Sequence, residues 1–164
     1  MIELLRADIT TLDVDAIVNA ANSALRGGGG VDGAIHSAAG SALLDELRQW
    51  SHCPAGSAVL TGGQDLRARY VIHAVGPIWH GGDRDEPQLL RSAYERAFEL
   101  AREHEDIRTI AFPAISTGVY NYPKSEAARI AVDAMLGHEG DLERIVICVF
   151  DDDNLAAYQR ALGL

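Results

Sequence analysis

The stretch Ile17-Val-Asn-Ala-Ala-Asn-Ser-Ala-Leu-Arg-Gly-Gly-Gly-Gly-Val-Asp-Gly-Ala-Ile-His36 contains a short apolar run, two asparagines and four consecutive glycines. An acidic residue then opens a segment that can be helical. Glycine has no Cβ, so the backbone can approach a ligand closely and point successive N–H groups at it. A helix that begins after the glycines adds the positive end of its dipole. The stretch predicts a diphosphate cradle. The alternative is a flexible connection, which four glycines make costly in backbone entropy.

The length and composition of the chain fit one folded domain over residues 1–164, because 48% of the residues are hydrophobic and no tract is of low complexity. No apolar run approaches the roughly 20 residues that span a bilayer. Charged residues stand near the N-terminus, where a signal peptide has its apolar stretch. We therefore expect a cytoplasmic protein with no membrane partner.

The formal net charge of −10 argues against general nucleic-acid binding, which needs an electropositive surface. It also implies that a bound diphosphate is held by backbone N–H groups and helix dipoles more than by Lys or Arg. Cys53 and Cys148 lie far apart in the sequence. We expect both thiols to be free, because disulfides are rare in cytoplasmic proteins.

Short apolar segments alternate with helical patterns along the chain. Strands are predicted at 2–6, 16–19, 57–61, 70–75, 109–113 and 144–150, and helices at 32–40, at 41–50, from Pro87, from Pro123 to Gly137, and after Asp151 to Asp153. This alternation predicts a three-layer α/β/α domain with a central mixed, largely parallel sheet. The sequence shows no second domain, linker or internal repeat.

A second loop, Ile115-Ser-Thr-Gly-Val-Tyr120, also follows an apolar strand and precedes a helix. Ligands of open α/β sheets gather at the carboxyl ends of the strands. The loops after Asn19 and after Pro113 are therefore expected to clamp opposite sides of one ligand. Ser-Thr-Gly alone is a common sequence and carries little weight without this pairing. The Walker A motif and the dinucleotide-binding glycine motif are both absent.

The histidines and acidic residues form no metal signature, and we expect neither a metal nor a cofactor. His36 follows the glycine run and either faces the site or is structural. His73 stands in the middle of an apolar strand and is expected to be buried. Asp151 to Asp153 are explained by capping of the last helix rather than by a cation.

Six segments of the chain together match the sequence pattern of one protein family: Ala7-Asp-Ile-Thr10, Asp15-Ala-Ile-Val-Asn-Ala-Ala-Asn22, Gly27 to His36, Val71-Ile-His-Ala-Val-Gly-Pro77, Ala111-Phe-Pro-Ala-Ile-Ser-Thr-Gly-Val-Tyr120 and Phe150-Asp151. Together they resemble the macrodomain family, most closely its bacterial and mitochondrial-type branch of ADP-ribosyl hydrolases and O-acetyl-ADP-ribose deacetylases. The resemblance covers almost the whole chain and implies a single macrodomain over 1–164. It implies ADP-ribose, its esters and ADP-ribosylated proteins as partners, and we separately expect a monomer.

The resemblance also implies a role for each site position. Asp8 would accept a hydrogen bond from the adenine amino group, with Ile9 beside it and Phe150 packed on the base. Two loops would enclose the phosphates and the distal ribose: Gly28, Gly29, Gly30 and Val31 in the first, and Ser116, Thr117, Gly118, Val119 and Tyr120 in the second. As bare sequence, Asp8 also suits a turn or cap, and Phe150 also suits the core.

The implied activity is hydrolysis of an ADP-ribose ester, either an acetyl ester on the distal ribose or an ADP-ribosylated Asp or Glu of a protein. Asn22 would hold the ribose hydroxyls, and Asp32 would orient a water or take its proton. A helix N-terminus favours the charged form of a carboxylate, which would make Asp32 a weak base and leave a substrate phosphate oxygen as another acceptor. The alternatives are a non-catalytic reader and a phosphatase for ADP-ribose 1″-phosphate.

Two positions depart from the family pattern. Ala7 replaces the usual glycine before the aspartate, which is tolerated if its φ is negative. Asn121 stands where glycine is common, and asparagine tolerates left-handed backbone best among the other residues. Asn121 is expected to narrow the site near the distal ribose.

Overall fold

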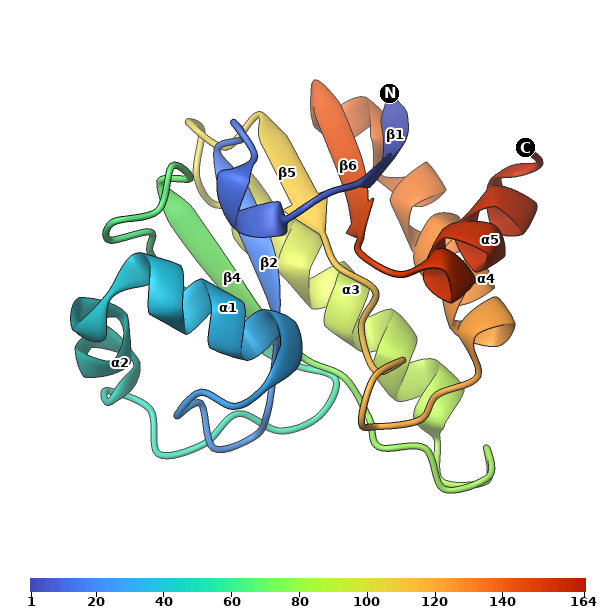
Figure 1. Ribbon diagram of the computed structural model, residues 1–164, viewed down its shortest axis with the longest axis horizontal. Coiled ribbons are helices and arrows are strands. Elements are labelled where there is room, and N and C mark those ends of the chain that lie inside the picture. The colour runs from blue at the N-terminus through green and yellow to red at the C-terminus, as the bar shows by residue number, and fades with distance from the viewer.

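A mixed six-stranded sheet with the strand order β1-β6-β5-β2-β4-β3 forms the middle layer of the protein (Figure 1). The structure is a computed structural model that describes residues 1–164. The strands are β1 Ile2–Arg6, β2 Ala16–Ala21, β3 Ala58–Gly62, β4 Tyr70–Val75, β5 Thr109–Phe112 and β6 Arg144–Val149. All neighbouring strands run parallel except β3, which pairs antiparallel with β4. The predicted mixed, largely parallel sheet is confirmed.

Helices cover both faces of this sheet (Figure 1). They are α1 Gly30–Ala39 and α2 Ser41–Leu47 on one face, and α3 Glu86–Arg102, α4 Lys124–Gly137 and α5 Asp152–Leu162 on the other. Two 3-10 helices, Ile9–Thr11 and Glu139–Asp141, were not predicted. The arrangement confirms the three-layer α/β/α architecture.

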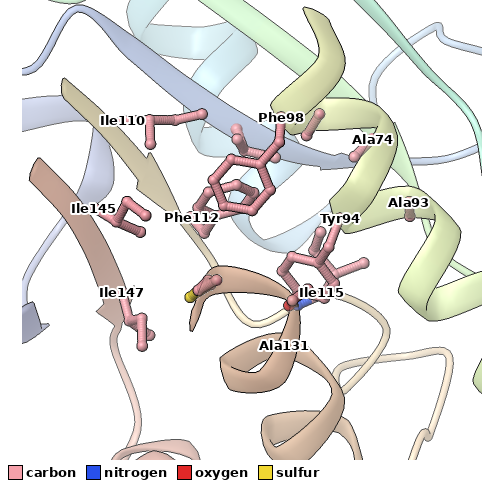
Figure 2. Packing of buried hydrophobic residues seen from close by; sticks show 14 of the residues in the cluster. Ala74, Ala93, Tyr94, Phe98, Ile110, Phe112, Ile115, Ala131, Ile145 and Ile147 are labelled. Atoms are coloured by element: carbon pink, nitrogen blue, oxygen red, sulfur yellow. Dashed lines mark hydrogen bonds between the residues drawn. The ribbon is translucent and has the colours of Figure 1, made fainter. Parts of the chain in front are cut away.

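The larger hydrophobic cluster lies between the sheet and α3, α4 and α5. Phe98 of α3 packs on Phe112 of β5 with ring centroids 5.0 Å apart, and Tyr94 lies beside them (Figure 2). In β6, Ile145 to Val149 are all buried, because helices cover both faces of a parallel sheet and its strands become continuously apolar. The core therefore holds fixed the strand ends from which the functional loops emerge.

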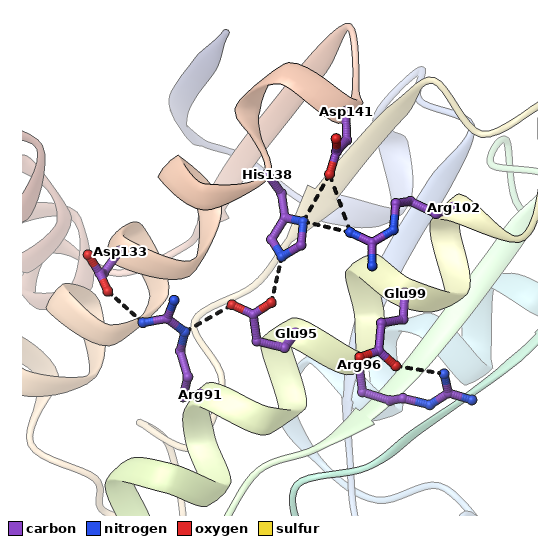
Figure 3. A network of polar contacts seen from close by, with 8 residues as sticks. All are labelled: Arg91, Glu95, Arg96, Glu99, Arg102, Asp133, His138 and Asp141. Atoms are coloured by element: carbon purple, nitrogen blue, oxygen red, sulfur yellow. Dashed lines mark hydrogen bonds and ion pairs between the residues drawn. The ribbon is translucent and has the colours of Figure 1, made fainter.

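A charged network on the outer surface joins α3 to the end of α4 (Figure 3). His138 lies between Glu95 and Asp141 and stacks on Phe98 with a centroid separation of 4.4 Å. Arg102 reaches the same Asp141. The exposed pair Arg102–Asp141 contributes little to stability, whereas His138 is mostly buried between its partners, so the network holds this corner together away from the carboxyl ends of the strands.

Several predicted boundaries need correction. Helix α1 begins at Gly30 rather than Asp32, because Gly29 takes the extended N-cap position and places Asp32 in the first turn. Strand β6 ends at Val149, so Phe150 is 68% exposed and the interpretation of it as a core residue is wrong. Asp151 caps α5 by accepting a hydrogen bond from the N–H of Asn154, as expected.

Three smaller observations bear on the expectations from the sequence. Cys53 and Cys148 are both buried and free. His73 is fully buried, as predicted. None of the helices has the length and apolar character needed to cross a membrane.

Candidate functional site

A cleft of about 1010 Å³ opens at the carboxyl ends of the parallel strands. Its walls come from the segments that follow β1, β2, β5 and β6, with Gly76 after β4. Every residue predicted for the site lies on these walls: Asp8, Ile9, Asn22, Gly28, Gly29, Gly30, Val31, Asp32, Ser116, Thr117, Gly118, Val119, Tyr120 and Phe150. This is the position at which open α/β sheets bind ligands.

The glycine loop forms one wall and leads directly into α1. Gly29 is the N-cap of this helix and provides no side-chain hydrogen bond to its first turn. The first N–H groups of a helix have no partner within the helix, so those of α1 are available to a ligand. A Cβ at Gly29 or Gly30 would meet nothing within 4 Å. The wall therefore exposes backbone donors, as an anion cradle requires.

Asp32 is 5% exposed, yet it lies on the cleft wall in the first turn of α1. Its Oδ1 accepts a hydrogen bond of 2.8 Å from Asn19 Nδ2 and lies 3.3 Å from His36 Nε2. Its Oδ2 would lie 3.3 Å from a Cβ at Gly28, so this oxygen faces the glycine loop.

The proton affinity of Asp32 differs from the expectation based on the helix dipole. Burial raises the pKa of Asp32, and the opposing effects of the hydrogen bond from Asn19 and of nearby His36 do not cancel it. The expectation from the sequence included the helix dipole and not the desolvation of the carboxylate, which acts in the opposite direction. A carboxylate with a raised pKa is a better general base near neutral pH.

Asn22 closes the turn between β2 and the glycine run. Its Nδ2 donates to the carbonyl of Gly27 at 3.1 Å, and its Oδ1 accepts from the N–H of Leu25 at 3.1 Å. A Cβ at Gly28 would lie 3.4 Å from this Nδ2 and 3.3 Å from the Oδ2 of Asp32. The structure thus places Asn22 and Asp32 together around Gly28, as the sequence predicted.

Asp8 and Phe150 stand at the other end of the cleft. Asp8 caps the first 3-10 helix, because its Oδ1 accepts from the N–H of Thr10 at 3.0 Å and from the Thr10 hydroxyl at 2.7 Å. Both hydrogen bonds go to Oδ1, so Oδ2 keeps its capacity to accept from a ligand. The capping role is confirmed, and it does not exclude a binding role for the same side chain.

The second loop is held by unusual backbone geometry. Ser116 has a φ of +68°, and its hydroxyl donates to the carbonyl of Pro77 at 2.8 Å. Gly76 makes this approach possible, since a Cβ there would lie 2.1 Å from the Ser116 Oγ. Asn121 has a φ of +61°, which confirms the expected left-handed geometry.

Tyr120 brings the second loop to the Asp32 end of the cleft. Burial raises the pKa of Tyr120, and the charge of Asp32 raises it further. Val119 lies at the rim with 91% of its surface exposed. Residues of both loops therefore line one cleft, as the sequence predicted.

Sequence reasoning missed the polar residues beneath the cleft. Asn19 and Thr61 are fully buried beside His73. The available signal in the sequence was a polar residue inside an otherwise apolar strand. Only the fold shows that three strands bring Asn19, Thr61 and His73 together. No group of three or more His, Cys, Asp or Glu side chains is placed to hold a metal ion.

The fold and the cleft define an α/β protein whose loops fit a phosphorylated ligand at the carboxyl ends of the strands. The family model of the macro domain matches residues 18–131, and the chain belongs to the macro domain family. The resemblance that the sequence suggested is therefore confirmed.

Two relatives match almost the full length of the chain. A macro domain-containing protein of Ralstonia nicotianae is 58% identical, over 97% of this chain and 92% of its own length. An O-acetyl-ADP-ribose deacetylase of Klebsiella pneumoniae is 56% identical, over 98% of this chain and 95% of its own.

Solved structures show the same fold. A point mutant of the Oceanobacillus iheyensis macrodomain with ADPR superimposes with a TM-score of 0.92 at 40% identity, covering 99% of this chain and 91% of that one. The Trypanosoma brucei macrodomain in complex with ADP-ribose has a TM-score of 0.90 at 42% identity, covering 99% and 69% of the two chains.

Proposed function

We propose that this protein binds ADP-ribose and hydrolyses its ester-linked derivatives. The substrates are O-acetyl-ADP-ribose and mono-ADP-ribose on Asp or Glu side chains of proteins. The name of the Klebsiella pneumoniae relative and the ligands of the two solved macrodomains support the proposal. The observation that carries it is Asp32, a buried carboxylate with a raised pKa on the wall of the cleft.

The ligand lies along the cleft with its adenine between Asp8 and Phe150. The diphosphate occupies the space between the glycine loop and the second loop, where backbone N–H groups suit an acidic protein with a net charge of −10. The distal ribose then reaches Asn22, Asp32 and Tyr120. Asn22 retains one Nδ2 hydrogen for a ribose hydroxyl, because the other is donated to Gly27.

The reaction is attack of water on the carbonyl carbon of the ester. Asp32 orients the water through Oδ2 and accepts its proton, and the bond between the acyl carbon and the ribose oxygen breaks. The products are ADP-ribose, which receives a proton on the released oxygen, and a carboxylic acid. A substrate phosphate oxygen is the alternative proton acceptor, and the raised pKa of Asp32 favours the carboxylate.

The raised pKa of Asp32 predicts a displaced acid limb in the pH profile of kcat. As the pH falls through this pKa, Asp32 takes up a proton and can no longer accept one from water. We expect turnover of O-acetyl-ADP-ribose to begin falling at a pH above the usual titration range of an aspartate. A kcat that stays constant as the pH falls through the usual titration range of an aspartate would contradict the role of Asp32 as base.

Gly33→Ala is expected to displace the glycine loop, since its Cβ would lie 2.6 Å from the carbonyl oxygen of Gly28. The matched control is Gly137→Ala at the end of α4, where a Cβ meets nothing within 4 Å. Relative to this control, Gly33→Ala should lose about 1–3 kcal/mol of unfolding free energy, as overpacking typically does, and should weaken ADP-ribose binding. Denaturant titration and calorimetry measure both quantities, and equal results for the two variants would refute the close contact.

The substrate class is tested by offering the wild-type protein three compounds at equal concentration: O-acetyl-ADP-ribose, a glutamate-ADP-ribosylated protein and ADP-ribose 1″-phosphate. Release of ADP-ribose from either ester supports the proposal. Release from the phosphate alone would identify a phosphatase instead. Binding of ADP-ribose without release from any of the three would identify a reader of ADP-ribosylated proteins.

A further inference from the structure

Three polar side chains lie on one face of the sheet beneath α1. Asn19 belongs to β2, His73 to β4 and Thr61 to β3, and these strands are neighbours in the sheet. Asn19 and His73 are direct partners in the strand register. All three are 0% exposed, and none of them lines the cleft. Burying a polar group costs free energy unless the group is hydrogen-bonded, so each of these side chains is expected to have a hydrogen-bond partner.

These residues form a continuous chain of hydrogen bonds that ends on Asp32. Asn19 Nδ2 lies 2.8 Å from Asp32 Oδ1 and 3.1 Å from His73 Nδ1. His73 Nε2 lies 2.9 Å from the Thr61 Oγ1, and this hydroxyl donates to the carbonyl of Gly62 at 3.1 Å. We call this set of contacts the Asp32–Thr61 chain.

The ionised state of Asp32 fixes the direction of every bond in the chain. A carboxylate only accepts, so the Asn19 amide must turn its Nδ2 toward Asp32. The same nitrogen faces His73 Nδ1, which must then accept, and the proton of the imidazole is left on Nε2. His73 can do so only when it is neutral, and burial lowers its pKa to about 3. Thr61 then accepts from Nε2 and donates to Gly62.

A second arrangement of the same atoms satisfies protonated Asp32. The Asn19 Oδ1 has no hydrogen-bond partner in the present orientation. If the amide turns over, this oxygen accepts from the Asp32 hydroxyl and from a proton on His73 Nδ1. His73 Nε2 then accepts from Thr61. The chain therefore has two directions: the present one suits ionised Asp32, whereas the reversed one requires a proton on Asp32 Oδ1 and turns the Asn19 Nδ2 toward the side where the Asn19 Oδ1 now has no partner.

We propose that Asn19, His73 and Thr61 are positioning residues that set the proton affinity of Asp32 through the direction of the Asp32–Thr61 chain. The inference rests on the proposed role of Asp32 as the base. The other titratable groups near Asp32 are His36, one turn along α1, and Tyr120 of the second loop. His36 also lies near His73, with ring centroids 6.4 Å apart. Neither has a hydrogen bond to Asn19, but the charge of His36 acts on both Asp32 and His73.

Thr61→Val tests the proposal at the far end of the chain. It keeps the shape of the side chain and removes the acceptor for His73 Nε2–H, so the imidazole proton moves to Nδ1 and the Asn19 amide turns over. Asp32 then faces an oxygen in place of an N–H donor. Losing a hydrogen bond to a charged group should move the acid limb of the kcat profile to higher pH by about one to two units. KM should be unchanged.

Two further variants separate positioning from stability. Thr61→Ser keeps the hydroxyl and should restore the wild-type pH profile. Tyr158→Phe removes another buried hydroxyl, which lies 3.3 Å from the Tyr94 hydroxyl on the opposite face of the sheet. It should affect stability and leave the acid limb in place. An equal shift in Tyr158→Phe, or none in Thr61→Val, would overturn the proposal.

Nuclear magnetic resonance tests the chain without any turnover. The ¹⁵N shifts of wild-type His73 should report a neutral ring with its proton on Nε2, moving to Nδ1 in Thr61→Val, while the ¹³C titration of Asp32 moves to higher pH. A proton on Nδ1 in wild type with Asp32 ionised would overturn the inference. If wild type turns over none of the proposed substrates, the proposed function fails, and these shifts still decide the inference.

Discussion

Asp32→Ala is expected to lower turnover of O-acetyl-ADP-ribose by about 10²–10⁴-fold, the usual contribution of a positioned general base. ADP-ribose affinity should stay within a few-fold of wild type, because the proposed diphosphate contacts come from backbone N–H groups. The measurement is kcat at saturating substrate together with calorimetric titration of ADP-ribose. The expected signature is lost chemistry with retained binding.

Asp13→Ala is the matched control for this variant. Asp13 is exposed and does not line the cleft, so its removal changes the net charge of the protein by the same amount without touching the site. Turnover by Asp13→Ala should equal that of wild type. Unchanged turnover by Asp32→Ala would remove this residue from the mechanism and leave the substrate phosphate as the proton acceptor.

Asp8→Ala is expected to weaken ADP-ribose binding by about 1.5–3 kcal/mol, the typical value of a hydrogen bond to a charged group. This corresponds to a loss of affinity of roughly 10–150-fold. The variant also loses the cap of the first 3-10 helix, where Asp8 Oδ1 accepts two hydrogen bonds from Thr10. A second substitution is therefore needed to separate the two roles.

Asp8→Asn separates capping from adenine recognition. Its amide oxygen can replace Oδ1 at the cap, whereas its NH₂ group cannot accept a hydrogen bond from the adenine amino group. We expect thermal stability near that of wild type with most of the affinity loss retained. Calorimetry that finds wild-type affinity in Asp8→Asn would sink the assignment of this side chain to adenine.

The sequence was most informative where backbone geometry decides the structure. The glycine run and the loop from Ile115 to Tyr120 are local patterns placed after apolar strands, and the rule for strand ends in α/β sheets brings them to one cleft. A left-handed backbone was also expected at Asn121, where glycine is common in the family, and the structure confirms it. Phe150 needed the fold, because its exposure depends on where β6 ends.

The properties of Asp32 depend on tertiary structure and were not accessible from the sequence. The helix dipole is a local effect and could be predicted, but burial of the carboxylate comes from the packing of α1 over the sheet. The neighbours of Asp32 were hidden for a related reason. Asn19 and His73 stand 54 positions apart, and only the register of β2 with β4 makes them contacts.

Exposed apolar residues at the cleft fit the orientation proposed for the ligand. Phe150 is 68% exposed and lies at the Asp8 end, where a stacked base would cover its ring. Val119 is 91% exposed at the rim of the second loop. Isolated exposed side chains of this kind are common on protein surfaces, so the orientation rests on Asp8, Asp32 and the glycine loop between them.

Wild-type protein alone is enough to decide whether the cleft hydrolyses an ADP-ribose ester or only binds ADP-ribose. Acetate release from saturating O-acetyl-ADP-ribose would be followed over many equivalents of substrate, with ADP-ribose calorimetry on the same preparation. We predict ADP-ribose binding together with many molecules of acetate released per protein chain. Tight ADP-ribose binding with acetate release no faster than in buffer would contradict the proposed hydrolase activity and leave a binding module.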